Sequence, residues 1–340
     1  MLSRLSLRSK VGNSSVKSVA LFLLLSATLY AGSITAVGDV MLGSNYPDPG
    51  MLDSCPVDSL RVLQEIPKTP IVFCNMEGTL LDGGSPVKQC ANCFLFRMPE
   101  SYVSQFEAAG FNLISLANNH SRDFGPVGSR TTAELLRLRN IKYASYSEPW
   151  DTFTVDGVRY GFCAFNTAWH RPEEAESIIV SMRSLCSILI VSMHGGAEGV
   201  GHSHVTRHKE TYYGESRGDV YRFAHRCVDA GASIILGHGP HVTRAVELYK
   251  GKFIAYSLGN FATCGFKLQG ATAIAPIIQV TFDDRGDFVS GKIYPVRQGR
   301  YSPPMLDPER AAIEEIIALT KQDFPKTRLT ITEDGDILKN

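Results

Sequence analysis

Residues 187–196 read SILIVSMHGG and residues 232–241 read ASIILGHGPH, and each is an apolar run that stops at a histidine. Between them, residues 217–230 carry apolar side chains at helical spacing. The order of apolar run, helix and apolar run is typical of neighbouring strands in an α/β protein. This part of the chain therefore predicts two buried strands that end at His194 and His238.

The same pattern extends outward in both directions. Residues 33–39, 69–78 and 111–120 are further apolar runs that stop at polar residues. Strand–helix alternation, with hairpins in the second half, predicts an α/β fold of two facing mixed β-sheets with helices outside. Helices are expected at residues 57–66, 99–109, 126–140, 217–230 and 308–321, and hairpins at 152–165, 244–261 and 274–296, with Asp156-Gly157 and Lys250-Gly251 at two of the turns.

Length and composition are those of an ordinary globular protein. The 340 residues are 44% hydrophobic and 20% charged, with 34 basic residues balanced by 34 acidic ones. No stripe of alternating basic and aromatic residues is present, so we expect no nucleic-acid partner. We expect one main domain over residues 34–300, followed by a C-terminal helix and tail over 301–340.

The first 33 residues differ from the rest. Basic residues precede the first acidic residue, Asp39, and Val19–Ala31 is almost wholly apolar. This apolar run is shorter than the ~20 residues of a spanning helix, which favours a signal peptide over residues 1–33. An uncleaved signal anchor, a transit peptide and a buried first element are the alternatives. We therefore expect an extracytoplasmic protein, either secreted or anchored to the membrane through this segment.

The cysteines give a weaker signal. Cys74, Cys163 and Cys186 lie in or beside apolar runs, where cysteine is typical of a buried core. Cys90 and Cys93 form a C-x-x-C sequence with no second ligand pair, which argues against a zinc knuckle. If the protein is exported, a local disulfide between Cys90 and Cys93 is one alternative, and because Cys55 also lies in a loop the sequence leaves the pairing open.

Polar side chains at the ends of five apolar runs carry the functional signal. Ligands bind outside the carboxyl ends of strands in open α/β sheets, so these side chains are expected to meet at one edge. Carboxylate, amide and imidazole groups suit Mn, Zn, Fe or Mg, bound as one or two ions. The predicted metal ligands are Asp39, Glu77, Asn119, His194, His238 and His241, with Glu77 as the candidate for a bridging carboxylate and His120 as the candidate proton donor.

Each of these residues taken alone has a structural explanation, such as an Asx turn or a hydrogen-bonded histidine. Asn260 is expected to orient a ligand. Arg217 and Asp219 are expected to cap the helix that follows them, and His225 is expected to be structural. The residues left open between the rim of a cleft and an ordinary structural role are Glu198, His202, His204 and His208 in one loop, and Trp169 and His170 after another strand.

The polar strand ends resemble two related families. Gly38-Asp39, Asn75–Gly78, Asn118–His120, His194 and Gly237–His241 follow the motif order of the calcineurin-like metallophosphoesterases. The blocks AVGDVMLG, NMEGTL, SLANNHSRDFG, SMHGG, GHGPHV and IAYSLGNF are similar to those of the CapA family, over residues 34 to 297. This resemblance implies a four-layer sandwich of two mixed β-sheets flanked by helices, the calcineurin-like metallophosphoesterase fold, with a dinuclear site.

The CapA resemblance also implies a function. It implies biosynthesis or export of a poly-γ-glutamate-type capsule polymer, with an anionic polymer or phosphoester as substrate and a membrane-bound polymer synthase as partner. Metal-dependent phosphoester hydrolysis with His120 as general acid is the alternative, and a scaffold with an inactive site is the third. Met41 replaces the first motif's histidine, and Glu77 replaces an aspartate. His238 and His241 are three residues apart instead of two, so the number of ions and the reaction stay open.

Overall fold

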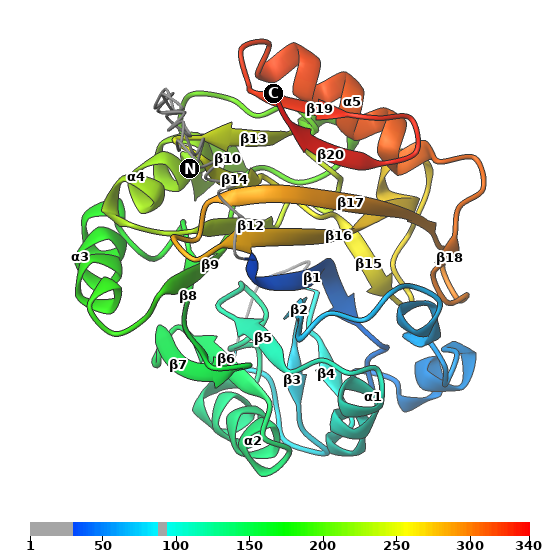
Figure 1. The fold of residues 1–340 in the computed structure, drawn as a ribbon. Helices are drawn as coiled ribbons and strands as arrows, with labels where there is room; N and C mark the ends of the chain where they lie inside the picture. The colour runs from blue at the N-terminus through cyan, green and yellow to red at the C-terminus, as the bar shows by residue number, and fades with distance from the viewer. Residues whose placement is uncertain (1–29, 88–93) are drawn as a thin grey trace, which may run out of the picture.

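The computed structural model describes residues 30–87 and 94–340, and its centre is a pair of mixed β-sheets (Figure 1). The larger sheet has the order β19-β20-β17-β16-β1-β2-β5-β6, with β15 paired to β1 and β18 paired to β17. Strands β1, β2, β5 and β6 are parallel, whereas β16 joins β1 antiparallel. The strands are β1 (Tyr30–Met41), β2 (Ile71–Met76), β5 (Leu113–Leu116), β6 (Lys142–Ser145), β15 (Asn260–Thr263), β16 (Ile274–Asp283), β17 (Phe288–Arg297), β18 (Met305–Leu306), β19 (Leu329–Ile331) and β20 (Asp336–Lys339).

The smaller sheet has the order β13-β14-β12-β9-β8-β7. Its central strands β8, β9, β12 and β14 are parallel, and β7 and β13 join at the edges as antiparallel hairpins. Asp156 and Gly157 form the β7–β8 turn with φ values of 50° and 79°, as the hairpin prediction requires. The strands are β7 (Trp150–Val155), β8 (Val158–Asn166), β9 (Ile188–His194), β12 (Ile234–His238), β13 (Val246–Tyr249) and β14 (Lys252–Ala255).

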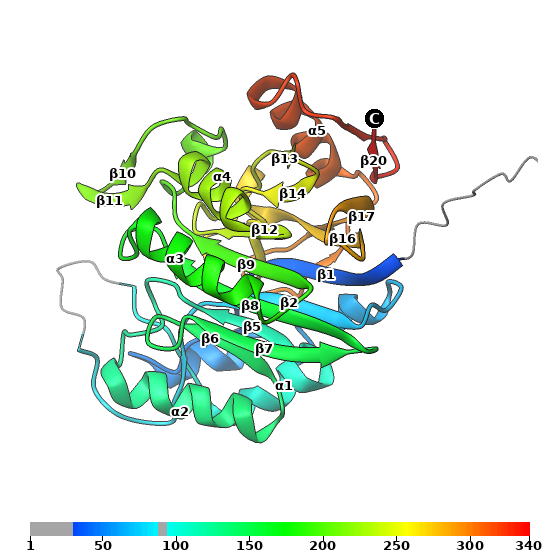
Figure 2. The same ribbon diagram turned by 60° about the vertical axis from the view of Figure 1, so that its left-hand side comes forward.

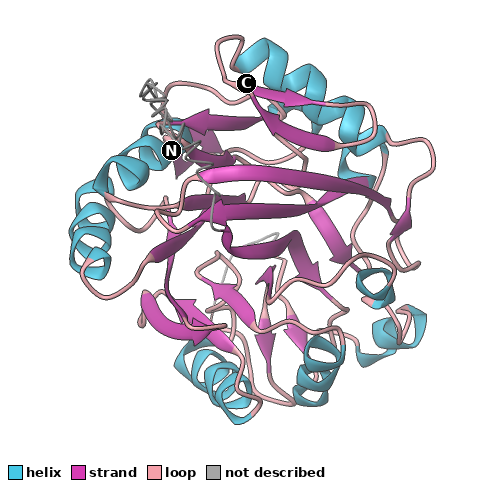
Figure 3. Cartoon of the chain, in the orientation of Figure 1, coloured by secondary structure: helices cyan, strands magenta, loops and turns pink. Residues whose placement is uncertain are grey.

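Helices cover the outer faces of the two sheets, so that strands fill the centre and helices lie on the periphery (Figure 3). Helices α1 and α2 pack on β1, β2 and β5 of the larger sheet, and α3 and α4 pack on β8, β9 and β12 of the smaller sheet. The apolar core between the sheets includes Phe73, Leu113, Phe162, Ile190 and Leu236. These layers confirm the predicted four-layer sandwich. The helices are α1 (Val103–Ala108), α2 (Gly125–Leu138), α3 (Pro172–Arg183), α4 (Val220–Ala230) and α5 (Ala311–Asp323).

The prediction of a helix at residues 57–66 is wrong. This region holds only a short 3₁₀ turn, η2 (Arg61–Gln64), after another at η1 (Pro49–Ser54). Leu60 and Leu63 are buried in the core beneath the larger sheet. The apolar residues whose spacing suggested a helix therefore anchor an irregular segment to this core. The sequence also gave no sign of α3, of the short strands β3 (Thr79–Leu80) and β4 (Arg97–Met98), of the β19–β20 hairpin, or of the hairpin β10 (Glu210–Tyr212) and β11 (Glu215–Gly218), which projects from the body in Figure 2.

The predicted N-terminal signal segment lies almost wholly outside the described residues and stays a prediction. Strand β1 begins at Tyr30, which pairs with Asp283 of β16. Among the helices formed by residues 30–87 and 94–340, none has both the length and the apolar character needed to cross a membrane.

A disulfide joins two loops that are distant in sequence. Cys55 and Cys264 are bonded, and they lie 209 positions apart in sequence. The C-x-x-C pair Cys90 and Cys93 lies outside the described residues. Cys74 is buried, as its apolar neighbours predict. The disulfide ties the segment after η1 to the end of β15, beside the carboxyl end of β1.

Candidate metal centre

The carboxyl ends of strands from both sheets meet at one place. Asp39 of β1 lies in register with Asn75 of β2, and Glu77 directly follows β2. In the smaller sheet, His194 at the end of β9 lies in register with His238 at the end of β12. The side chains that the sequence placed at strand ends are therefore contributed by facing edges of two sheets.

Glycines directly before two of these residues allow the close approach. A β-carbon at Gly38 would lie 2.0 Å from the carbonyl oxygen of Gly259, and one at Gly237 would lie 2.2 Å from that of Tyr256. The backbone amide of Asp39 donates a hydrogen bond to the same Gly259 oxygen at 2.8 Å. Because only glycine fits such contacts, the Gly-Asp and Gly-His pairs fix where the strands can deliver their side chains.

Five side chains, two carboxylates and three imidazoles, form a compact and largely buried cluster. His194 Nδ1 lies 3.7 Å from Glu77 Oε1, and His241 Nε2 lies 3.9 Å from Glu77 Oε2. His241 Nδ1 lies 3.1 Å from Asp39 Oδ2. His238 joins through its Nδ1, which lies 3.5 Å from Asp39 Oδ1. Asp39, Glu77 and His194 each offer a ligand atom within 4.8 Å of the others.

Many polar atoms of this cluster lack hydrogen-bond partners. Both carboxylate oxygens of Glu77, Nδ1 of His194 and both ring nitrogens of His238 are buried without a hydrogen bond among the described residues. Buried polar atoms almost always have a partner, and leaving one unsatisfied costs about 1–3 kcal/mol. The unsatisfied atoms here are carboxylate oxygens and imidazole nitrogens, which are ligands for divalent ions. The residues present therefore fit a bound metal.

Burial and mutual charge shift the pKa values in the cluster. Burial alone would raise the pKa of Asp39, but the imidazoles of His238 and His241 hold it well below its usual range. Burial and the charge of Asp39 raise the pKa of Glu77 well above its usual value. Burial lowers the pKa of His194 well below its usual value. Burial opposes protonation of His241 too, yet Glu77 and Asp39 raise its pKa to about 10. A cation would favour the ionised carboxylate and neutral imidazoles.

A row of amide side chains orients Asp39. Asn75 Nδ2 donates to Asp39 Oδ1 at 2.8 Å, and Asn118 Nδ2 donates to Asn75 Oδ1 at 3.1 Å. The sequence proposed Asn119 as a ligand, whereas it is Asn118 that joins this row. Asn119 is half-buried, and its Oδ1 is buried without a hydrogen bond from any residue that the structure describes, so its ligand role stays a prediction.

Asn260 holds His241 in place, as the sequence suggested. Asn260 Oδ1 lies 3.0 Å from His241 Nδ1, and Asn260 Nδ2 donates to the backbone oxygen of His241 at 3.1 Å. His241 itself has a φ of 58°, in the left-handed region that non-glycine residues rarely adopt. Two bonds from one amide therefore support both the strained backbone and the ring of His241.

His120 lies beside the cluster with a carboxylate partner. Its Nδ1 lies 2.8 Å from Asp123 Oδ2, which also accepts a hydrogen bond from the backbone amide of Phe96 at 3.0 Å. The Phe96 ring lies 4.2 Å from the imidazole, centroid to centroid. A carboxylate on Nδ1 fixes the tautomer and orientation of a histidine that exchanges protons through Nε2. The arrangement fits the predicted role, which stays a prediction.

Comparison with known proteins assigns a family to this geometry. The family described as bacterial capsule synthesis protein PGA_cap matches residues 33–264, a range that includes every residue of the cluster. The chain belongs to the PGA_cap family. It is 27% identical over 258 residues to capsule biosynthesis protein CapA of Bacillus anthracis, covering 67% of this chain and 59% of that protein. It is 29% identical over 181 residues to PGA biosynthesis protein CapA of Bacillus subtilis strain 168, covering 47% and 44%.

The chain thus spans about half the length of these curated PGA_cap relatives. Its fold is similar to that of a phosphatase from Mycoplasma pneumoniae, with a TM-score of 0.51 at 12% identity, covering 80% of this chain and 97% of that one. These comparisons confirm both the CapA family and the calcineurin-like metallophosphoesterase fold.

Met41 stands where the first motif of the calcineurin-like metallophosphoesterases has a histidine. Its sulfur accepts a hydrogen bond from the backbone amide of Gly43 at 3.3 Å, and the side chain is buried. A thioether is a poor ligand for hard divalent ions. Met41 therefore adds nothing to the donor set of the cluster.

Sequence reasoning missed an ion pair at the edge of the cluster. Arg217 Nη2 lies 2.7 Å from Glu198 Oε1, and both side chains are largely buried. The charge of Arg217 contributes to the low pKa of His194. Asp219 caps α4 as predicted, through a hydrogen bond from the amide of Arg222, but Arg217 does not cap that helix. Arg217 lies in β11, and the β10–β11 hairpin turns it toward the cluster. A prediction of this hairpin from the sequence would have identified Arg217 as a neighbour of the cluster.

The remaining histidines have other partners. His204 Nδ1 lies 2.7 Å from Asp323 Oδ1, and His208 Nδ1 lies 3.2 Å from its neighbour's backbone oxygen. His225 Nε2 lies 2.9 Å from Glu247 Oε2, which confirms its structural role. The other members of the set left open contact neighbouring rings: His202 faces Tyr212, and Trp169 and His170 face Tyr146.

Proposed function

We propose that this protein acts in the synthesis or export of an anionic, poly-γ-glutamate-type polymer, and that a divalent metal at the strand-end cluster binds an anionic group of that polymer. The observation that carries the proposal is the set of buried, unsatisfied oxygen and nitrogen atoms on Glu77, His194 and His238. The names of the Bacillus relatives, capsule biosynthesis protein and PGA biosynthesis protein, supply the substrate class.

Different residues of the chain would bind the metal and position its ligands. Asp39, Glu77, His194, His238 and His241 would hold one or two ions of Mn, Zn, Fe or Mg. When bound, such an ion supplies Lewis acidity toward a carboxylate or phosphoryl oxygen. The amide row beginning at Asn75 and the contacts from Asn260 hold the ligand side chains in position, as outer partners of metal ligands do. Arg217 lies at the edge of the cluster, where Glu198 compensates its charge and holds its guanidinium group in position.

A binding experiment tests this proposal. Full-length protein loaded with Mn²⁺ should bind a fluorescent γ-linked glutamate decamer, measured by anisotropy. The His194→Ala variant should lose both metal and decamer binding, while His204→Ala, which changes a histidine outside the cluster, should retain both. Equal decamer binding by metal-free and metal-loaded protein would contradict a metal-dependent role.

A metal-dependent phosphoesterase is the second candidate, and the His120–Asp123 contact favours it. With Nδ1 held by Asp123, His120 would donate a proton from Nε2 to the leaving oxygen as the phosphoester bond breaks. We expect His120→Ala to lower phosphodiester turnover by about 10²–10⁴-fold with unchanged metal content. Turnover by the wild type that does not exceed an Asp39→Ala control would rule out the hydrolase.

We also propose an extracytoplasmic location, attached to or released from the membrane near a polymer synthase. The Cys55–Cys264 disulfide supports this proposal, because disulfides persist in oxidising compartments. In intact cells, externally added protease should degrade the protein. Complete protection of the protein, together with free thiols at Cys55 and Cys264, would contradict the location.

A further inference from the structure

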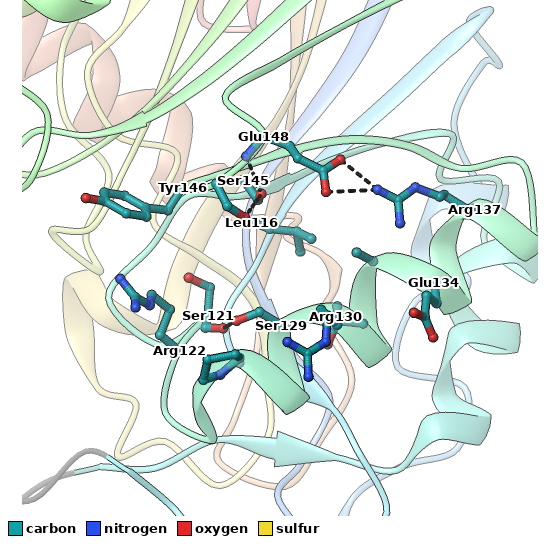
Figure 4. Close-up of a pocket in the computed structure, with 15 residues that line it drawn as sticks. Leu116, Ser121, Arg122, Ser129, Arg130, Glu134, Arg137, Ser145, Tyr146 and Glu148 are labelled. Carbon is teal, nitrogen blue, oxygen red and sulfur yellow. Dashed lines mark hydrogen bonds and ion pairs between the residues drawn. The ribbon is translucent and has the colours of Figure 1, made fainter.

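A cavity lined by several charged and hydroxyl-bearing residues lies next to the metal cluster along the sheet edge. It has a volume of about 440 Å³, within the usual range of ~300–1,000 Å³ for small-molecule sites (Figure 4). One wall is a face of α2, formed by residues at successive helical turns, and the other is the segment from Ser145 to Glu148 after β6. Leu116, at the end of β5, lies between them.

The cavity continues the same sheet edge that carries the cluster. Parallel strands follow the order β1, β2, β5 and β6, with Asp39 on the first and Glu77 directly after the second. Gly78 and Ser121 line the cavity, and each directly follows a cluster-side residue, Glu77 or His120. A ligand that extends from the cluster along this edge would therefore reach the cavity next.

The charges of the cavity favour an anion. Three arginines and two glutamates line it: Arg122, Arg130, Arg137, Glu134 and Glu148. Glu148 accepts two hydrogen bonds from Arg137, at 2.9 and 2.7 Å, so these two residues compensate each other.

Two guanidinium groups, those of Arg122 and Arg130, and one carboxylate, that of Glu134, remain, so the unpaired charge of the described lining is positive by one. Arg122 lies over the ring of Tyr146, 5.2 Å from its centroid. Within residues 30–87 and 94–340, neither Arg122 nor Arg130 forms an ion pair with a carboxylate, and both are exposed to solvent at the cavity. Arginine is well suited to carboxylate recognition because its planar group presents several donors at once.

We propose that this cavity binds a carboxylate of the same acidic oligomer, one or more units along the chain from the group held at the metal cluster. Arg122 and Arg130 bind the carboxylate, and Leu116 and Ala133 contact the methylene groups. The inference rests on the proposed function, because it takes an acidic polymer as the ligand. It adds that the protein recognises an extended segment instead of a single terminal unit.

The test compares a double variant, Arg122→Ser with Arg130→Ser, against wild type and an Arg139→Ser control. Arg139 lies at the end of the same helix but pairs with Glu107 and does not line the cavity. Binding of the fluorescent γ-linked glutamate decamer and of free glutamate is measured on Mn²⁺-loaded, full-length protein. An exposed arginine–carboxylate pair contributes up to about fivefold in affinity, so the double variant should bind the decamer several-fold and up to about 30-fold more weakly.

Three readouts complete the expected result. The double variant should retain wild-type metal content, melting temperature and affinity for free glutamate. The Arg139→Ser control should bind the decamer as wild type does. The difference in decamer affinity between wild type and the double variant should become smaller at high salt, because exposed charges are screened.

The results distinguish failure of the cavity proposal from failure of the proposed function. If wild type binds the decamer and the double variant binds it equally well, the cavity proposal is overturned and the proposed function stands. If metal-loaded wild type does not bind the decamer, both are overturned. If the double variant loses affinity for free glutamate as much as for the decamer, the two-subsite arrangement is wrong.

Discussion

The ion pair between Glu210 and Arg244 should anchor the loop that leaves the metal cluster. Arg244 is fully buried and bonds both oxygens of Glu210, at 3.0 and 2.8 Å. Its other hydrogen bonds go to the backbone oxygens of Ala197 and His202, and Glu210 accepts from the amide of Ala197. The pair therefore connects the segment after β9, which carries Glu198, to the core.

Replacing Glu210 by alanine leaves the Arg244 charge buried without a partner. Breaking a buried ion pair in this way typically costs about 3–5 kcal/mol of unfolding free energy. With an unfolding entropy of about 2.1 cal/mol/K per residue over roughly 300 residues, the melting temperature should fall by about 5–8 °C. Scanning calorimetry at neutral pH measures this fall. Asp229→Ala is the matched control, because its pair with Lys250 is exposed and is worth at most about 1 kcal/mol.

The pH dependence supplies a second check on the same variant. Burial alone would raise the pKa of Glu210, but Arg244 lowers it below the model-compound value of 4.5. A carboxyl whose folded pKa is depressed stabilises the fold above its unfolded pKa and loses that contribution as pH falls through the folded one. The gap between wild type and Glu210→Ala should therefore be constant above pH ~5 and narrow below pH ~4.5. A melting temperature within about 2 °C of wild type at neutral pH, or a gap that widens in acid, would refute the reasoning.

Three further predictions concern the surroundings of the cluster. Cys264→Ser should lower the unfolding free energy by about 2–5 kcal/mol in denaturant titrations, because it opens a long covalent loop. Cys186→Ser, which changes an unbonded cysteine, should lower it much less. Asn260→Ala should weaken metal affinity by about 10–100-fold in competition with a chelator, since it frees the ring of His241; unchanged affinity would contradict that role. If the protein hydrolyses phosphodiesters, His120→Asn should lower kcat with little change in KM, and a raised KM with unchanged kcat would argue for a binding role.

Local signals in the sequence predicted the strands and the ends of those strands. Apolar runs that stop at Asp39, His194 and His238 are readable because buried parallel strands are continuous and their carboxyl ends meet. Hairpin turns such as Asp156-Gly157 are equally local, since their backbone conformation depends on two residues.

Features that depend on distant packing could not be predicted in this way. The partner of Cys55 lies 209 residues away, and no local pattern encodes such a distance. Asn118 and Asn119 are adjacent, so only the position of Asn75 decides which one joins the amide row. Arg217 lies beside the cluster because a short hairpin turns it there, and its sequence neighbours suggested a helix cap instead.

Metal content, measured by elemental mass spectrometry on purified full-length protein, is the most direct test of the central claim. The wild type should carry near-stoichiometric Mn, Zn, Fe or Mg, and His194→Ala and His238→Ala should each lose it while His204→Ala keeps it. Folded wild-type protein that stays empty after incubation with Mn²⁺ and Zn²⁺ would contradict the metal centre.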